Sequence, residues 1–275
     1  MFDVTLLMLF ISPLFLLCIA LEYRRYRQHY RISDSILNTL LALSHQFSDA
    51  VALLLLLPLC GWLHQFSLFD IEITPLTLLC GFVLQDFLYY WFHRACHHIH
   101  WFWSAHVVHH SSTYLNFSTA FRQSLLYPIV GMWLFWLPLI MLGFSPELVF
   151  TIVSVNLAFQ FFIHTQTLGK LGWLEHIFNT PTHHCVHHAS NPEYIDKNFA
   201  GVLIIWDKLF GTFAPYRDNI QIKYGIRGEA PEPHFVAVNF AQWQHMLRLT
   251  RQAKGIKGKF QALFGYPSHL PERKP

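Results

Sequence analysis

Long apolar runs constrain the fold of this chain more than any other feature. They occupy residues 2–21, 36–63, 75–91 and 125–164, and Gly-Phe-Ser-Pro-Glu at 143–147 interrupts the last one. About 20 apolar residues in a helix cross a hydrocarbon core. Gly-Phe-Ser-Pro is typical of a turn, so we expect residues 125–164 to form a hairpin of two helices. Only 13% of the residues are charged, against about 25% in soluble domains. The sequence therefore predicts an all-α, polytopic membrane protein with about four to five transmembrane helices.

The basic residues favour one side of the membrane. Lys and Arg occur four times in residues 22–35, twice in 92–124 and thirteen times after residue 164, whereas 64–74 and 143–147 hold none. Because short cytoplasmic loops collect Lys and Arg, we expect the C-terminus and the histidine-rich segments at the cytoplasmic face of a multi-pass protein.

Composition divides the chain into three regions. We expect N-terminal transmembrane anchor helices in 1–74, a catalytic domain in 75–216 and a basic cytoplasmic amphipathic tail in 217–275. The tail mixes apolar residues at helical spacing with Lys and Arg, which is typical of a helix on an anionic membrane surface. A helix packed on the catalytic domain has the same pattern.

Histidine is the second strong constraint, with 19 in the chain. The pattern His-x-x-His-His is expected roughly 0.1 times by chance at this content, yet it occurs twice. Spacings of three and four place imidazoles on one helix face. The motifs and a third pair, His93-x-x-x-His97, comprise His93, His97, His106, His109, His110, His184, His187 and His188.

Eight imidazoles on one side of the membrane suggest two metal ions, since a tetrahedral zinc takes at most four protein ligands. Neutral imidazole suits iron, zinc and copper, and the carboxylate motif of soluble di-iron bundles is missing. The sequence thus predicts an all-nitrogen dinuclear centre in a cytoplasmic, helical, His-rich cap. His164 is a candidate ninth ligand, and Gln160 stands one turn before it on the same face.

Two carboxylates are candidates for the outer part of the centre. Asp86 lies seven residues before His93 and faces the same way, and Asp196 follows the second motif closely. Carboxylates that accept the outer N–H of metal-binding histidines fix the rings. Asp86 has an alternative role in a polar patch of the helix bundle. Asp86, Gln160 and Asp196 are the candidate catalytic residues.

The sequence resembles the fatty acid hydroxylase superfamily, also called the sterol desaturase family. The matching elements lie between Asp86 and Phe213: "DFLYYWFHRACH", "WSAHVVHHSSTYLNFSTAFRQS", "QFFIHT" and "NTPTHHCVHHASNPEYIDKNFAGVLIIWDKLFGTF". The last element looks most like the alkylglycerol monooxygenase branch.

The resemblance implies a membrane-bound, non-haem di-iron oxygenase that uses O2 on a lipid C–H bond. It implies that the eight motif histidines and His164 bind two Fe2+ ions, and other members carry a histidine where Gln160 stands. The implied partners are a bilayer lipid, O2 and an external electron donor, either a protein or a small reductant such as the tetrahydropterin of the ether-lipid branch. No nucleic-acid partner is expected.

Other functions remain open at this stage. A lipid or sterol desaturase would use the same di-iron site. A metal transporter is a weaker hypothesis because transport sites lie near the membrane midplane, and a haem electron carrier needs only paired axial histidines. The leading hypothesis is lipid hydroxylation, with ether-lipid cleavage as its most specific form.

Overall fold

The computed structural model describes residues 4–228 and 233–268, so parts of the first expected span and of the tail lie outside the described residues. The described residues form α-helices, short 3₁₀ helices and loops, without a β-strand. The prediction of an all-α fold is confirmed for this part of the chain.

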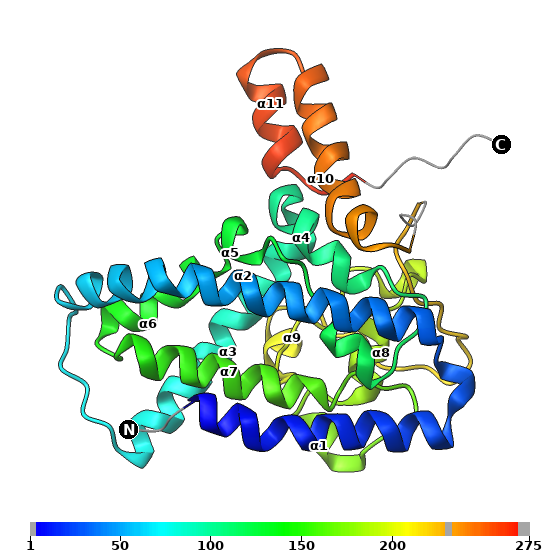
Figure 1. Cartoon of the computed structure of the whole chain (residues 1–275), viewed down its shortest axis with the longest axis horizontal. Coiled ribbons are helices and arrows are strands. Elements are labelled where there is room, and N and C mark those ends of the chain that lie inside the picture. The colour runs from blue at the N-terminus through cyan, green and yellow to red at the C-terminus, as the bar shows by residue number, and fades with distance from the viewer. Residues whose placement is uncertain (1–3, 229–232, 269–275) are drawn as a thin grey trace.

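Three long helices lie side by side in the body of the molecule (Figure 1). They are α1 (Val4–Arg25), α2 (Ile32–His64) and α7 (Pro146–Phe161), and α7 contacts both of the others. Among the described residues, α2 is the one helix long and apolar enough to cross a membrane. The expected spans at 75–91 and 125–164 do not meet this measure, and α7 has only 16 residues. The first expected span lies partly outside the described residues.

His93 and His97 lie in the last turns of an apolar helix. Helix α3 (Pro75–His98) begins at a capping box, in which Thr74 and Thr77 bond each other's backbone N–H, and it ends at the extended Ile99. Helix α4 (His100–His110) then packs back against α3. The first His-x-x-His-His motif therefore faces the end of α3.

The expected helical hairpin in 125–164 is wrong in its first half. That half is broken into α5 (Tyr127–Val130), the 3₁₀ helix η3 (Met132–Trp136) and α6 (Leu137–Leu142). Proline at residues 128 and 138 and the left-handed Gly131 (φ +90°) interrupt it, because proline lacks the N–H that a continuous helix needs. The turn at 143–147 is present, and Ser145 caps α7.

The tail forms a hairpin of α10 (Phe235–Gln252) and α11 (Gly255–Phe264), which projects from the body beside α4 (Figure 1). Helix α10 contacts α4 and buries Val238, Gln242 and Met246, so it follows the alternative of a helix packed on the catalytic region. Helix α11 buries no residue.

Candidate metal centre

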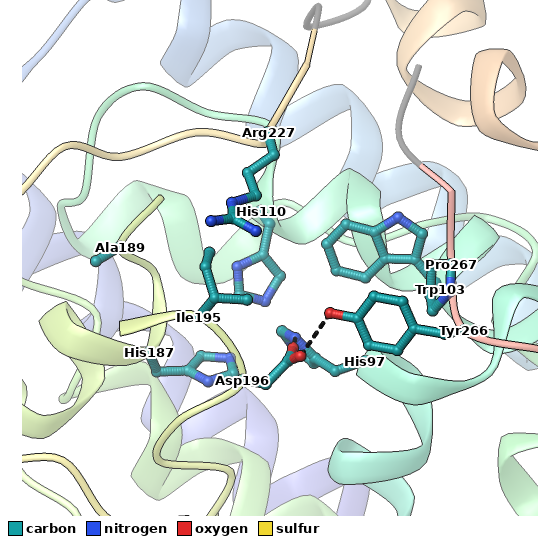
Figure 2. Close-up of a pocket in the computed structure, with 10 residues that line it drawn as sticks. All are labelled: His97, Trp103, His110, His187, Ala189, Ile195, Asp196, Arg227, Tyr266 and Pro267. Atoms are coloured by element: carbon teal, nitrogen blue, oxygen red, sulfur yellow. Dashed lines mark hydrogen bonds and ion pairs between the residues drawn. The ribbon is translucent and has the colours of Figure 1, made fainter. Parts of the chain in front are cut away.

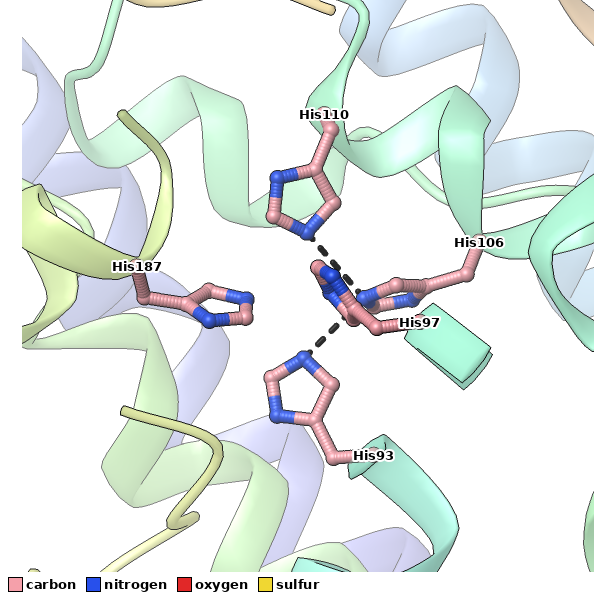
Figure 3. A group of neighbouring side chains, drawn as sticks. All are labelled: His93, His97, His106, His110 and His187. Atoms are coloured by element: carbon pink, nitrogen blue, oxygen red, sulfur yellow. Dashed lines mark hydrogen bonds between the residues drawn. The ribbon is translucent and has the colours of Figure 1, made fainter. Parts of the chain in front are cut away.

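The structure gathers all nine predicted histidines into two neighbouring buried groups. Within each group, one ring nitrogen per residue lies within 4.8 Å of the others. The five-histidine group is His93, His97, His106, His110 and His187 (Figure 3), and the four-histidine group is His109, His164, His184 and His188. His183 belongs to neither group.

Each His-x-x-His-His motif is divided between the two groups. The i, i+4 pair of α4 joins the five-histidine group, while the middle residue, His109, joins the other. Helix α8 (Pro181–His187) has His188 as its C-cap. Of its motif, only the middle residue His187 belongs to the five-histidine group, and His184 and His188 belong to the other. Both groups therefore share the same two helices and lie next to each other.

The Nε2 atoms, which face one another within each group and are called the inner nitrogens, are closely spaced. In the five-histidine group, the Nε2 of His106 lies 3.0 Å from that of His93 and 3.1 Å from that of His110. In the four-histidine group, successive Nε2 atoms are 3.0, 2.9 and 3.0 Å apart along the order His109, His164, His184, His188. Two nitrogens bound to one ion at about 2.1 Å each lie about 3 Å apart at right angles and about 3.4 Å apart in a tetrahedron.

The outer nitrogens decide which tautomers are present. A carbonyl oxygen only accepts, so a ring nitrogen facing one carries the proton, and the opposite nitrogen keeps its lone pair. Four Nδ1 atoms face backbone carbonyls: His93 at Phe199 (2.8 Å), His109 at Arg122 (3.2 Å), His164 at Gln160 (2.6 Å) and His187 at Lys197 (3.0 Å). The Nε2 atoms of His109 and His164 thus face each other with two lone pairs.

These features fit bound metal ions. A cation between two facing lone pairs replaces their repulsion with coordination. The Nε2 atoms of His97 and His187 are buried and have no hydrogen-bond partner among the described residues, which a metal ion would supply. Burial, and next the neighbouring histidines, hold the pKa of the six motif histidines at α4 and α8 well below the usual value, so these rings are neutral, as metal binding requires: His106, His109, His110, His184, His187 and His188.

Asp196 lies where the sequence predicts it, beside a histidine of the centre. Its Oδ1 is 3.4 Å from the Nδ1 of His97, and the hydroxyl of Tyr266 donates to its Oδ2 at 2.6 Å (Figure 2). Burial alone raises the pKa of Asp196, but the hydrogen bonds from His97 and Tyr266 outweigh it and bring the pKa below its usual value. The carboxylate is therefore ionised at neutral pH and holds the His97 ring. A pocket of about 50 Å³, which Trp103 and Arg227 also line, opens beside it.

Asp86 is not placed as expected, because its hydrogen bonds go to no histidine. Its carboxylate accepts from the side chains of Asn156 (2.8 Å) and Trp206 (2.9 Å) and from the backbone N–H groups of Val202 (2.8 Å) and Leu203 (3.0 Å). It is fully buried and ties the loop after the second motif to α3. Spacing along α3 could not show this, since the partners lie 70 or more residues away in the chain.

The loop at residues 195–201 holds the rings from outside. It supplies the carbonyls of Lys197 and Phe199 and the carboxylate of Asp196. The carboxylate of the buried Asp207, on α9 (Ile205–Leu209), accepts the N–H of Phe199 at 2.8 Å and so fixes the loop. Asp207 stands in the "IIWDKLFGTF" stretch, but no spacing rule marks it as a partner of this loop.

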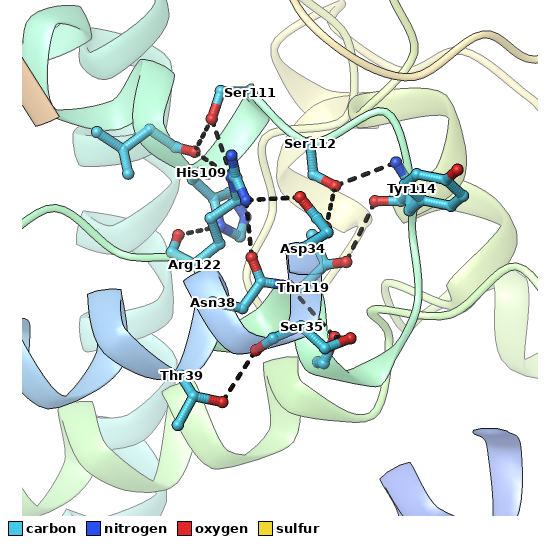
Figure 4. Close-up of polar contacts among 12 residues, drawn as sticks. Asp34, Ser35, Asn38, Thr39, His109, Ser111, Ser112, Tyr114, Thr119 and Arg122 are labelled. Carbon is cyan, nitrogen blue, oxygen red and sulfur yellow. Dashed lines mark hydrogen bonds and ion pairs between the residues drawn. The ribbon is translucent and has the colours of Figure 1, made fainter. Parts of the chain in front are cut away.

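Arg122 connects α2 to the centre (Figure 4). It is only 2% exposed and donates to Asp34 (3.0 Å), Asn38 (2.8 Å) and the carbonyl of Val108 (3.1 Å). Its own carbonyl accepts from the Nδ1 of His109 at 3.2 Å. From the sequence, Arg122 was considered only as one of the two basic residues in 92–124. Its location on an aromatic, polar loop between two apolar runs gave no sign of burial.

Two cavities lead from the centre along α2. The inner cavity, of about 190 Å³, is lined by His106, His109 and His164 and by Gln160. Gln160 accepts from Tyr89 at 2.8 Å and donates to Asn156 at 2.7 Å, so its side chain is held in the cavity wall. The outer cavity, of about 170 Å³, is mostly apolar and shares four lining residues with the inner one: His45, Tyr127, Met132 and Leu157.

Tyr127 is a further residue that sequence reasoning missed. Its hydroxyl lies 2.6 Å from the Nδ1 of His106, and its side chain lines both cavities. It therefore orients a histidine of the centre and borders the space beside it.

Comparison with known proteins agrees with this architecture. The sequence profile of the fatty acid hydroxylase family matches residues 78–212, which carry all nine histidines. Alkylglycerol monooxygenases of Danio rerio and Homo sapiens are both 42% identical, over 71% and 72% of this chain and 43% and 44% of their own lengths. An ornithine lipid hydroxylase of Rhizobium tropici is 31% identical over 50% of the chain and 41% of its own.

The chain spans less than half the length of these relatives. No solved structure matches it.

Proposed function

This chain belongs to the fatty acid hydroxylase family through residues 78–212, and from that membership we propose that it is a membrane-bound, non-haem di-iron oxygenase that hydroxylates a C–H bond of a lipid with O2. The observation that carries the proposal is the pair of buried histidine groups with facing Nε2 lone pairs. An alkylglycerol is the proposed substrate, because the relatives aligned over 71% and 72% of the chain are named alkylglycerol monooxygenases. A desaturase is not favoured for the same reason.

In this proposal the five- and four-histidine groups hold two Fe2+ ions, which supply the redox chemistry that activates O2. The backbone carbonyls and Asp196 keep the Nδ1 atoms protonated and the Nε2 atoms directed inward. The inner cavity excludes water and holds the lipid C–H bond next to His106, His109 and His164.

The reaction needs an external donor of two electrons, a protein or a small reductant such as tetrahydropterin. One oxygen atom enters the C–H bond next to the ether oxygen as a hydroxyl, and the other leaves as water with two protons. The resulting hemiacetal breaks into a fatty aldehyde and glycerol.

We also propose the membrane arrangement. Residues 1–74 anchor a catalytic region at 75–216, the protein is multi-pass, and the histidine centre and the basic tail at 217–275 face the cytoplasm. The distribution of Lys and Arg and the apolar helix α2 support this arrangement. α2 lines both cavities, so the anchor also contributes to the site.

The test uses the full chain in detergent with Fe2+, O2, tetrahydropterin and a 1-O-alkylglycerol. We expect two irons per chain, no haem Soret band, and a fatty aldehyde formed in step with O2 consumption. His109→Ala and His187→Ala should each reduce the iron content, because they remove a ligand from different groups. Full iron content and activity in both variants would refute the assignment of the centre.

A further inference from the structure

A polar pair interrupts the apolar helix α2. His45 and Asp49 are the only charged or histidine side chains between residues 35 and 63 of this helix. They stand one turn apart, with 3.3 Å between Nε2 and Oδ2, and their side chains are 17% and 39% exposed. Polar groups in an apolar setting cost free energy unless their hydrogen bonds are satisfied, and within a membrane helix they usually serve a function.

One hydrogen-bonding position of the pair is unused. The Nδ1 of His45 is buried and makes no hydrogen bond among the described residues, although the backbone of Ser124 lies near the ring. The Nε2 of the same ring faces Asp49.

The pair faces the cavities beside the centre. His45 lines both cavities and Asp49 lines the outer one. The other outer walls are mostly apolar, and the hydroxyl of Ser154 is bonded to the carbonyl of Phe150 at 2.9 Å. A hydrocarbon chain beside His45 would leave its Nδ1 without a hydrogen-bond partner among the described residues.

The pair also lies one side chain away from a histidine of the centre. The rings of His45 and Tyr127 are in edge contact, with centroids 5.6 Å apart. The hydroxyl of Tyr127 is 2.6 Å from the Nδ1 of His106. A polar group bound by His45 and Asp49 would therefore sit close to the carbon held at the centre.

We infer that His45 and Asp49 form a specificity-determining site that hydrogen-bonds a free hydroxyl group carried by the lipid near the reacting C–H bond. The Nε2 of His45 carries the ring proton toward Asp49, so the Nδ1 of His45 and the Asp49 carboxylate both accept, and a hydroxyl donates its one hydrogen bond to either of them. The ligand class is a single-chain lipid with a hydroxylated head group. The inference rests on the proposed function, because it concerns the lipid that the cavity admits.

The test measures binding without turnover. Quenching of tryptophan fluorescence by a chain-brominated 1-O-alkylglycerol is compared with quenching by the alkyl methyl ether of equal length, since Trp133 and Trp136 line the outer cavity. The wild-type protein should bind the glycerol ether about tenfold more tightly, the effect of a hydrogen bond to a charged or buried partner. Asp49→Leu and His45→Phe should abolish this preference, and Asp49→Asn should keep part of it. Gln46→Leu, an exposed polar neighbour on α2, should retain it fully.

The outcomes separate the two proposals. Equal preference in the wild type and in Asp49→Leu, with aldehyde still formed from the glycerol ether, overturns the role of the pair and leaves the proposed function standing. A preference that disappears in both variants supports the pair, even if no preparation makes aldehyde, which would count against the function. Iron content equal to that of the wild type shows that the variants are folded.

Discussion

At the scale of single residues, the outer nitrogen of each imidazole decides what the inner nitrogen does. Where Nδ1 donates to a carbonyl, as in His93 and His164, Nε2 carries a lone pair available to a metal ion. Where Nδ1 meets a carboxylate, as in His97 with Asp196, the ring also gains a negative neighbour. The imidazole rings of the two histidine groups are thus held by different partners, backbone carbonyls in some cases and a carboxylate in another.

Asp196→Asn should lower metal affinity by about 10- to 100-fold, because the amide keeps the volume of the side chain and removes the charge that holds His97. Iron retained against increasing chelator concentrations measures the effect. Glu193→Gln is the matched control, since Glu193 is an exposed carboxylate just before the same loop. An equal loss of iron in both variants would contradict the role of Asp196.

Acidification should destabilise the metal-free protein. The pKa values of His106, His109, His110, His184, His187 and His188 lie below the usual value in the folded chain. As the pH falls through about 6.5, the unfolded chain binds protons that the folded chain does not, so the stability present above this pH is lost. Thermal unfolding in chelator should give a melting temperature that falls from pH 7.5 to 5.5; a rise would count against buried neutral histidines.

At the scale of elements, α4 and α8 are the shared frame of the centre. Each is short, and each sends rings into both groups. Their positions depend on outside contacts: Arg122 ties the end of α4 to α2, and Asp86 ties the loop after α8 to α3. The two buried charges therefore act on the centre by positioning its elements.

Arg122→Met should reduce the free energy of unfolding by about 3 kcal/mol, the cost of removing one partner of a buried ion pair, because Asp34 and Asn38 lose their donor. Denaturant unfolding and iron content measure it, and Arg122→Lys should recover part of the stability. Arg24→Met is the control at an exposed arginine. A change no larger than in that control would exclude the positioning role.

At the scale of the whole molecule, the centre lies at the inner end of two joined cavities that follow α2. The face of α2 on the outer cavity repeats at helical spacing, at His45, Asp49, Ala52, Leu53 and Leu56. The same helix is the one described helix that is long and apolar enough to span a membrane. A lipid therefore has a route along this helix to the histidines, which is apolar at Ala52, Leu53 and Leu56 and polar at His45 and Asp49.

Ala52→Phe should block this route without disturbing the centre. We expect kcat/KM for a 16-carbon alkylglycerol to fall by about tenfold or more, since overpacking a filled space costs at least 1 kcal/mol, while an 8-carbon chain is affected less. Ala50→Phe makes the same change at an exposed position of α2 that does not line the cavity. Equal losses for both chain lengths, or in both variants, would contradict the proposed channel.

The sequence by itself determined the helical class and the candidate histidines, because helical periodicity and His-x-x-His-His spacing are local properties of the chain. It also placed Asp196 beside the centre, since that residue follows the second motif within one loop. The breaks in 125–164 could be predicted in part, because Pro128, Gly131 and Pro138 are local helix-breaking residues. The length of the apolar run nevertheless favoured a continuous helix.

Only the tertiary structure decided how the motifs are shared and what holds them. The division of His106 and His110 from His109 depends on where α8 docks. The roles of Arg122 and Asp86 depend on partners more than 80 and 110 residues away in the chain, at Asp34 and Val202. The cavity along α2 likewise exists only between elements. Such contacts depend on how the elements pack in three dimensions, so the periodicity of the sequence cannot predict them.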